Sequence, residues 1–384
     1  MKEYITIKGV GPLRDINGLE ILPITVLIGE SAIGKSTLMK LVSMMRYLYK
    51  MANIRSYLKH SRITSSPFRV RFDTMIKNTG LQSMLGAESF IEYAVLMANG
   101  HRYSVSVCNK RLGKLPIIDK EDLLFTKISF ISENRNVIPI WAEKASVNAG
   151  ATLGFYFHET NNDFTRASEA DQVVSLDYVN LKLHITHPKG KAVRYRVEHT
   201  GNAHAPIDLR EASSGIQTSA PLALIVKHFA HEYSFKDAFN RSVLSYLHEI
   251  ERLTKFKAVA ESSDLENIVY VHVEEPELSL FPDAQCKLVE ELVFAATHAE
   301  ADRKVNMMFA THSPYILNYL NIVLNQTDTG RASLDHDSLA VYRLFDGQAQ
   351  SLLAQDENGR WIVDTYDLTE MMNCIYNEYS RLVR

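Results

Sequence analysis

The chain has 384 residues, 46% of them hydrophobic, and a formal net charge of −3. This length allows two or three domains, or one large α/β domain with an insertion, and the near-neutral charge excludes a global attraction to nucleic acid. The widely spaced Cys108, Cys286 and Cys374 exclude a disulfide framework or a zinc site and favour a reducing compartment. Residues 1–3 lead directly into a strand pattern and no apolar run reaches membrane-spanning length, so we expect a cytoplasmic protein.

The N-terminal third of the chain is predicted to contain short strands and one helix. Period-two alternation, or a short apolar run between turn residues, predicts strands over residues 4–8, 19–22, 24–28, 90–96, 103–107 and 126–132. Residues 98–101 predict the turn of a hairpin between the fourth and the fifth of these strands. Apolar residues at helical spacing predict a helix from Lys35 to about Lys50.

The segment from Gly29 to Thr37 matches G-x-x-x-x-G-K-[ST], the phosphate-binding P-loop, and it follows the strand at 24–28. Its glycines allow close approach of the backbone to a phosphate, and the helix beginning at Lys35 directs its N–H groups and positive dipole end toward an anion. We expect Lys35 to contact the β- and γ-phosphates and the Ser36 hydroxyl to ligate Mg²⁺. The residues expected at the nucleotide are Gly29, Ser31, Ile33, Gly34, Lys35, Ser36 and Thr37. A plain strand–turn–helix is the alternative interpretation.

The rest of the chain predicts an inserted lobe followed by alternating strands and helices. Residues 134–204 predict a lobe that is β-rich or irregular. Strands are predicted over residues 181–185, 193–197, 268–273 and 305–309, and helical periodicity over residues 213–259 and 366–382. Alternation of strands with helices in the C-terminal part is typical of a parallel sheet.

Carboxylates follow the apolar strand at 268–273, in the order Glu274-Glu275-Pro276-Glu277. A nucleotide site on a parallel sheet needs carboxylates at the carboxyl end of a strand. The first, Glu274, can support Mg²⁺, and the second, Glu275, can orient the attacking water near the γ-phosphate. Taken alone, such a cluster is more often a solvated strand end, and the preceding P-loop favours the functional interpretation.

Two further segments complete the candidate site. In Phe309-Ala310-Thr311-His312-Ser313-Pro314, His312 stands where a strand ends and a helix begins, within reach of a γ-phosphate; a structural histidine is the alternative. In Ser213-Ser214-Gly215-Ile216-Gln217, a serine is a good N-cap in any protein. The functional alternative is a second phosphate-binding helix N-terminus.

In this order the motifs resemble the ABC-class ATPases of the RecF, SMC and OLD branch, including anti-phage defence ATPases such as PtuA and AriA. The segment IKGVGPLRDI…ILPITVLIGESAIGKST resembles the N-terminal strands and Walker A of that branch, and SSGIQ is similar to its signature motif. The segment VYVHVEEPELSLFP resembles its Walker B, catalytic glutamate and D-loop, and FATHSPYIL resembles its switch-histidine loop. Three features depart from the branch: Glu30-Ser31-Ala32-Ile33 replaces the common Pro-Asn-Gly-Ser, Ile216 replaces a signature glycine, and only 132–135 is a weak Q-loop candidate.

The resemblance implies an α/β P-loop NTPase of the ABC-ATPase type, with a mixed, mainly parallel sheet and helices on both faces. The ATPase core would comprise residues 1–133 and 205–384, with the inserted lobe at 134–204. It implies ATP and Mg²⁺ as cofactors. The guanine-specificity element N-K-x-D does not follow the P-loop, which favours ATP over GTP. It also implies a homodimer or higher homo-oligomer of head-to-tail heads, with ATP between one P-loop and the other head's signature. The residues implied at the nucleotide, catalytic or metal positions beyond the P-loop are Ser214, Gly215, Gln217, Glu274, Glu275 and His312.

Two functions remain open from the sequence. One is a sensor or scaffold ATPase of a bacterial anti-phage defence system that controls a separately encoded effector, a nuclease or toxin. The other is a RecF-like or SMC-like ATPase of DNA repair or maintenance. The interval between P-loop and signature predicts a compact lobe instead of a coiled coil, and about 70 residues after His312 are too few for a TOPRIM nuclease; both features favour the first function. A transporter subunit fits the motifs less well, and hydrolysis is expected to be slow.

A basic and aromatic stretch follows the P-loop. It contains Arg46, Lys50, Arg55, Lys59, Arg62, Arg69 and Arg71 together with Tyr47, Tyr49 and Tyr57. Cations and aromatic rings together suit phosphate contact and base stacking. The alternative is a solvated helical face beside the P-loop helix.

Overall fold

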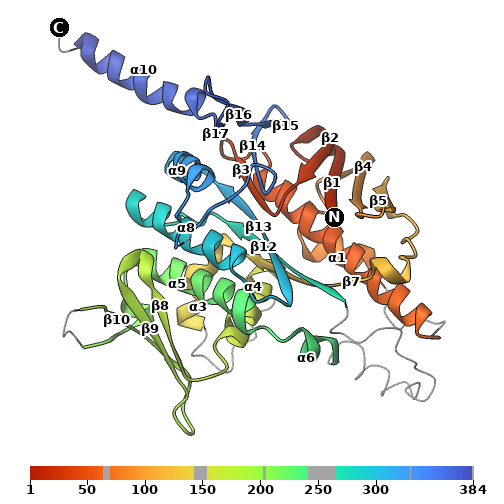
Figure 1. Cartoon of the computed structure of the whole chain (residues 1–384), viewed down its shortest axis with the longest axis horizontal. Helices are drawn as coiled ribbons and strands as arrows, with labels where there is room; N and C mark the ends of the chain where they lie inside the picture. Colours follow the sequence, from red (N-terminus) through yellow and green to blue (C-terminus); the bar gives the residue numbers. More distant parts are fainter. Residues whose placement is uncertain (64–69, 142–153, 202–204, 241–264, 329, 383–384) are drawn as a thin grey trace.

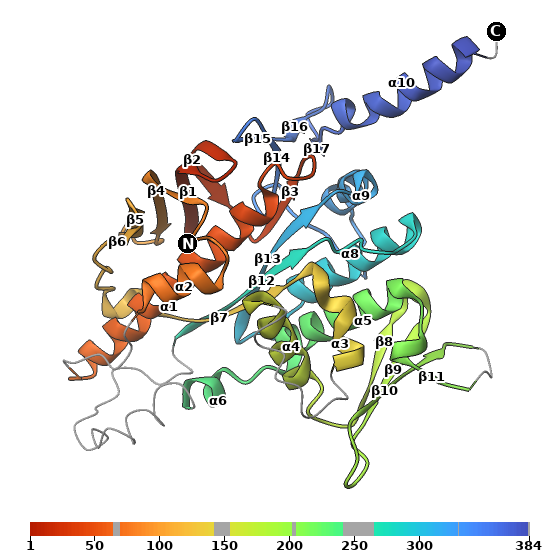
Figure 2. The same ribbon diagram turned by 180° about the vertical axis from the view of Figure 1, so that it is seen from behind.

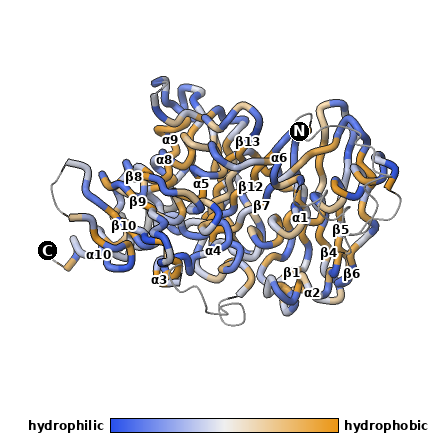
Figure 3. Tube along the Cα trace, turned by 90° about the horizontal axis from the view of Figure 1, so that it is seen from below, coloured by the Kyte–Doolittle hydropathy of each residue, from blue (hydrophilic) through white to orange (hydrophobic). Residues whose placement is uncertain are grey.

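The computed structural model describes residues 1–63, 70–141, 154–201, 205–240, 265–328 and 330–382. The fold is mixed α/β, with three larger sheets and a two-stranded ribbon, as Figure 1 shows. Hydrophobic residues gather along the central strands β12 and β13 in Figure 3. No helix within the described ranges combines the length and apolarity needed to cross a membrane.

A six-stranded sheet forms the centre of the fold, in the order β15-β14-β3-β13-β12-β7. All its strands except the edge strand β15 run parallel to their neighbours. Their bounds are β3 Ile24–Ile28, β7 Leu124–Ile131, β12 Glu266–Glu274, β13 Arg303–Thr311, β14 Leu339–Phe345 and β15 Gln348–Ser351. Because β3, β12 and β13 are buried almost throughout, these strands read as continuous apolar runs in the sequence.

A five-stranded antiparallel sheet lies on the other side of helix α1 (Lys35–His60) in Figure 1. Its strands are β2 Leu13–Ile21, β1 Lys2–Val10, β4 Leu85–Leu96, β5 Arg102–Cys108 and β6 Arg111–Leu112. The predicted end of α1 near Lys50 was wrong. Residues beyond it, such as Ala52, Ile54 and Leu58, are still buried, because α1 is covered on several sides. A helix buried all round has no clear amphipathic period to mark its end.

The segment after β7 contains a helix that the sequence pattern did not predict. Helix α4 (Phe155–Ala167) packs against β7, and the antiparallel sheet β11-β10-β9-β8 follows it. The buried positions of α4 include the polar Thr160 and Asp163, which bond to β7 and to the residue after it, so its buried face is not purely apolar. The strands of this lobe are β8 Gln172–Leu176, β9 Leu181–Thr186, β10 Arg194–His199 and β11 Ile207–Asp208.

The helical pattern predicted from Ser213 to Val259 is interrupted. Helix α5 (Ser214–Lys227) continues into one π-helical turn and ends at the extended Tyr233, after which α6 (Phe235–Phe239) begins. The hydroxyl of Ser234 accepts a hydrogen bond from Asp237 N, so Ser234 caps a new helix. Residues 241–264 lie outside the described ranges.

The C-terminal part adds helices and a projecting terminus. Helices α8 (Pro282–Thr297) and α9 (Pro314–Asn325) pack against each other, and the ribbon of β16 (Leu353–Gln355) and β17 (Trp361–Val363) contacts α9. Helix α10 (Tyr366–Leu382), which was predicted with these bounds, extends away from the rest of the molecule in Figure 1. Two short α-helices also lie in the described ranges, α2 (Phe72–Asn78) and α3 (Ile138–Trp141).

Candidate active site

The carboxyl ends of β3, β13 and β12 meet at one edge of the central sheet. In the parallel registers Thr311 pairs with Ile28, and Glu274 pairs with Ala310. The predicted phosphate loop, histidine loop and acidic cluster follow these three strands directly. Three segments that are far apart in the sequence therefore lie at the same edge, which in open parallel sheets is where ligands bind.

The phosphate loop places the Lys35 ammonium over its own backbone. Lys35 Nζ donates hydrogen bonds to the carbonyl oxygens of Gly29 at 2.7 Å and Glu30 at 2.8 Å. Burial lowers the pKa of this ammonium group, although the nearby carboxylate of Glu275 acts in the opposite direction. A phosphate would supply the negative charge that this buried ammonium lacks. Gly34, with φ 111°, permits this turn, since a Cβ there would lie 2.8 Å from Leu13 Cδ2.

The other predicted residues of the phosphate loop differ in their exposure. Ser31 is exposed, Ile33 is half-buried, and both lie in the loop between β3 and α1. Thr37 is buried.

Glu274 and Ser36 form the pair expected to hold Mg²⁺. Burial raises the pKa of the Glu274 carboxyl group, and Lys40 and a hydrogen bond with Ser36 act in the opposite direction. Lys40 Nζ lies 3.7 Å from Glu274 Oε1, and this buried oxygen has no hydrogen-bond partner within the described part of the chain. A buried carboxylate oxygen with an unused lone pair, beside a hydroxyl, is a donor set that fits Mg²⁺.

Glu275 and His312 face each other at the same edge. His312 Nε2 lies 3.9 Å from Glu275 Oε1, and His312 Nδ1 lies 3.5 Å from Lys35 Nζ. The backbone N–H of His312 donates to Glu277 Oε1 at 2.6 Å, which holds the histidine loop against the acidic cluster. Glu275 has a φ of 45°, a left-handed conformation that costs a non-glycine residue free energy. Strain at such a residue is common where the surroundings fix a functional side chain.

The signature-like segment begins α5 next to the acidic cluster. Ser213 and Ser214 are exposed, whereas a Cβ on Gly215 would lie 2.6 Å from the carbonyl oxygen of Ser279. Gln217 turns back on its own chain and donates from Nε2 to the carbonyl oxygens of Arg210 and Ala212. The two serines are thus available to a partner, while Gly215 is required by packing and the Gln217 amide is already engaged.

Arg135 is a residue of this region that the sequence reasoning did not assign a role. It is fully buried, and its guanidinium donates to the carbonyl oxygens of Glu274 at 2.6 Å, Glu275 at 2.5 Å, Thr218 at 3.0 Å and Ser132 at 3.1 Å. Burial lowers its pKa to about 10. One side chain therefore connects α5, the end of β7 and both carboxylate-bearing residues. The sequence feature that could have pointed to Arg135 was the weak Q-loop candidate at residues 132–135.

The basic and aromatic stretch does not form one surface. Arg46 is buried and bonds to Glu3 Oε2 at 2.9 Å, with its guanidinium 4.0 Å from the Tyr270 ring centroid. Tyr49 and Tyr57 are buried as well. The interpretation of Arg46 as a nucleic-acid contact was wrong, because α1 turns that position toward the space between two sheets. Arg69 lies outside the described residues, so its part in the prediction is untested.

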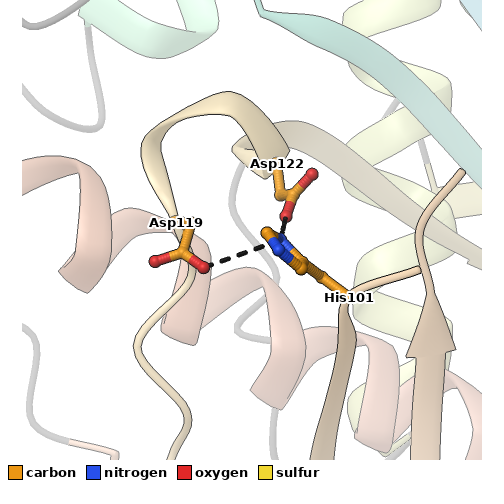
Figure 4. A group of neighbouring side chains, drawn as sticks. All are labelled: His101, Asp119 and Asp122. Carbon is orange, nitrogen blue, oxygen red and sulfur yellow. Dashed lines mark hydrogen bonds and ion pairs between the residues drawn. The ribbon is translucent and has the colours of Figure 1, made fainter. Parts of the chain in front are cut away.

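A separate histidine and carboxylate group joins the β4–β5 turn to the segment before β7, as Figure 4 shows. His101 Nδ1 lies 2.6 Å from Asp122 Oδ2 and 3.6 Å from Asp119 Oδ2. Tyr103 and Asn99 also donate to Asp122. These bonds lower the pKa of Asp122 and raise that of His101. Because the carboxylate oxygens of Asp122 already accept protein hydrogen bonds, the group holds the turn in place.

No protein-family model and no curated protein matches the chain. Among solved structures, the SMC head domain from Thermotoga maritima is similar with a TM-score of 0.36 and 12% identity, over 92% of this chain and 98% of that chain. The recombination mediator protein RecF, in a structure described as RecF-ATPrS in the RecFOR pathway, is similar with a TM-score of 0.32 and 12% identity, over 91% of this chain and 97% of that chain. At these scores neither likeness assigns a role to a residue.

Proposed function

We propose that this chain is an ABC-class ATPase that binds ATP with Mg²⁺ and hydrolyses it to ADP and phosphate. One observation carries the proposal: Lys35, Glu274, Glu275 and His312 gather at the carboxyl edge of a parallel sheet, after three different strands. A phosphate-binding amine, a buried carboxylate and a second carboxylate beside a histidine are the groups that phosphoryl transfer to water requires.

Each residue then has one task. Lys35 exchanges its bonds to the loop carbonyls for bonds to the β- and γ-phosphates. Ser36 and Glu274 hold the metal ion, which neutralises charge that develops on the phosphate oxygens. Glu275 orients the attacking water and accepts its proton, while His312 contacts the γ-phosphate from the neighbouring strand end.

The test of nucleotide binding is Lys35→Ala, with Lys59→Ala as control, since Lys59 is an exposed lysine on the same helix. Calorimetry should show ATP binding to the control and a loss of at least 100-fold in affinity for Lys35→Ala, because the charge aimed at the phosphates is removed. Equal affinities of the two variants, with both folded by circular dichroism, would rule out the P-loop assignment.

The proposed active form is a pair of heads in which Ser214, Gly215 and Gln217 of one head approach the nucleotide of the other. Exposure of Ser214 at the start of α5 supports this arrangement. In the hydrolysis-deficient Glu275→Gln protein, light scattering should detect an ATP-dependent dimer, and Ser214→Arg in the same background should prevent it, since a bulky cation is disfavoured at a helix N-terminus. An unchanged dimer fraction would contradict the head-to-tail arrangement.

The biological role that we propose is that of a sensor or scaffold in an anti-phage defence system, acting on a separately encoded effector. The compact arrangement of α4 and β8–β11, in the interval where a coiled coil would mark a chromosome-structuring ATPase, supports this role. Exposed apolar residues on α10, Ile375, Tyr379 and Leu382, offer a docking face at helical spacing. The alternative is a DNA-maintenance ATPase.

Affinity purification from the native host separates the two roles. ATP-locked Glu275→Gln and nucleotide-free Lys35→Ala proteins should retain a nuclease or toxin to different extents, and a coupling of about 1–3 kcal/mol is typical of such allosteric control. Recovery of no protein partner in either state, together with stimulation of hydrolysis by DNA alone, would establish the DNA-maintenance role instead.

A further inference from the structure

A cavity of about 650 Å³ lies beside α1, away from the P-loop end of that helix. Its walls come from α1, α2, β7 and α4, which follow one another along one side of the molecule in Figure 2. This volume is within the usual range for small-molecule sites, about 300–1,000 Å³. None of the residues assigned to ATP lines the cavity, so it is a separate site from the proposed ATPase site.

The charged residues of the cavity are mainly cations. Its lining includes Lys50, Arg71, Lys127 and Arg166, against the single carboxylate of Glu159. Lys127 Nζ is paired with Asp163 at 2.7 Å, at the base of α4. With the carboxylates of Glu159 and Asp163 counted together, four cations stand against two anions. An anion bound in the cavity would balance the excess positive charge.

Lys50 is the cation of the cavity wall that most strongly indicates an anionic ligand. Burial, reinforced by the charge of Lys127, lowers the pKa of Lys50 to about 8. Among the described residues no hydrogen bond or ion pair of its ammonium group is found. A partly buried ammonium without a partner is costly. The hydroxyl of Tyr156, a residue of the same wall, is also buried and has no hydrogen-bond partner among the residues that the structure describes. Two polar residues with an unsatisfied group thus belong to the wall of one cavity.

Aromatic rings provide the second recognition element. Tyr156 packs against Phe130 with ring centroids 4.0 Å apart and against Phe155 with centroids 5.3 Å apart. Tyr47 on α1 and Phe155 on α4 also line the cavity but remain 44% and 39% exposed. Partly exposed rings on two different helices of the wall are suited to stacking on a planar ligand.

We propose that this cavity binds a small anion that carries a planar ring, of the nucleoside monophosphate class. Lys50 and the Tyr156 hydroxyl would contact the phosphate, with Arg166 and Arg71 adding charge, and Tyr47 and Phe155 would stack on the base. The site also adjoins the ATPase edge: Lys40 Nζ lies 5.4 Å from the Tyr156 ring centroid and 3.7 Å from Glu274 Oε1.

The test uses the full chain carrying Lys35→Ala, so that the P-loop does not contribute, with AMP, GMP, CMP and UMP as probes in calorimetry. ATP is titrated separately, so failure of the P-loop assignment is recognised independently. At least one monophosphate should bind with micromolar to submillimolar affinity. Adenosine and inorganic phosphate should each bind at least tenfold more weakly than AMP, because adenosine lacks the phosphate group and inorganic phosphate lacks the base.

The variants Lys50→Met and Tyr156→Phe locate the site, with Lys77→Met as control, since Lys77 is an exposed lysine on α2 that does not line the cavity. Lys50→Met should weaken binding at least tenfold, Tyr156→Phe about threefold, and the control not at all. Lys50→Met removes a partly buried charge, so the variant should fold. Absence of binding by all four monophosphates, equal binding by phosphate alone, or binding unaffected by Lys50→Met would each overturn the proposal.

Discussion

Two polar regions of the molecule differ in whether their buried charged groups have hydrogen-bond partners. Between the sheets, Arg46 bonds to Glu3 and lies 3.2 Å from His272 Nε2, Glu3 accepts a bond from Tyr93, and His272 Nδ1 contacts the carbonyl oxygen of Ser129. Burial, reinforced by the Arg46 charge, lowers the pKa of His272 to about 3, so this ring is neutral and its Nε2 accepts from Arg46. The two charged side chains of this core network, Arg46 and Glu3, bond to each other and to neighbouring polar side chains.

The carboxyl edge of the sheet differs from the core network. Within the described part of the chain, Glu274 Oε1 and Glu277 Oε2 are buried there without hydrogen-bond partners, and Lys35 donates to its own loop. Buried polar atoms are normally bonded, so unsatisfied ones at a strand edge indicate a place for a ligand. The comparison predicts that substitutions in the core network lower stability and that substitutions at the edge lower activity.

The largest expected effect is on stability, from Arg46→Met. Removal of the guanidinium leaves the buried Glu3 carboxylate without its cation, which typically costs about 3–5 kcal/mol. Urea unfolding measures this loss, and the double variant Glu3→Gln/Arg46→Met should recover part of it. ATP turnover per folded molecule should remain near that of the unchanged protein. A stable Arg46→Met protein with impaired turnover would reverse the assignment of the core network.

Glu275→Gln should show the reverse behaviour. An amide cannot accept the proton of the attacking water, so hydrolysis should fall about 100-fold or more, while ATP affinity and the unfolding midpoint change little. The matched control is Glu88→Gln, the same chemical change at an exposed position on β4. Single-turnover hydrolysis is the measurement. A normal rate for Glu275→Gln would remove this residue from the catalytic role.

Arg135 shares features of both regions: it is a buried charge like Arg46, and its hydrogen bonds within the described residues go to carbonyl oxygens at the edge. Arg135→Lys retains the charge but cannot span the carbonyls of Thr218, Glu274 and Glu275. We expect kcat to fall about tenfold, equivalent to about 1.4 kcal/mol, with KM for ATP nearly unchanged. A raised KM with normal kcat would show that Arg135 supports binding instead of positioning Glu275.

The sequence predicted the strands of the edge well because their signals are local. An apolar run is visible within ten residues when a glycine loop follows it, as after β3, when carboxylates follow it, as after β12, or when a histidine and a helix start follow it, as after β13. The same approach failed for Arg46 and did not identify Arg135, since the partners of each lie on distant segments. It also missed α4, whose buried face includes Thr160 and Asp163 bonded to β7 and the residue after it.

The smallest effect is expected at Ala32, in the phosphate loop. Ala32 has a φ of 64°, a left-handed conformation that costs an alanine about 1–2 kcal/mol relative to glycine. Ala32→Gly should therefore stabilise the protein by about 0.5–1 kcal/mol after the greater entropy of the unfolded glycine chain is included. The control Ala87→Gly, at an exposed position in β4 without positive φ, should destabilise it by about 0.5–1 kcal/mol. Opposite signs in urea unfolding would show that the edge stores strain in its backbone as well as unsatisfied bonds in its side chains. Equal losses for both variants would contradict that conclusion, because the left-handed turn would then cost alanine nothing.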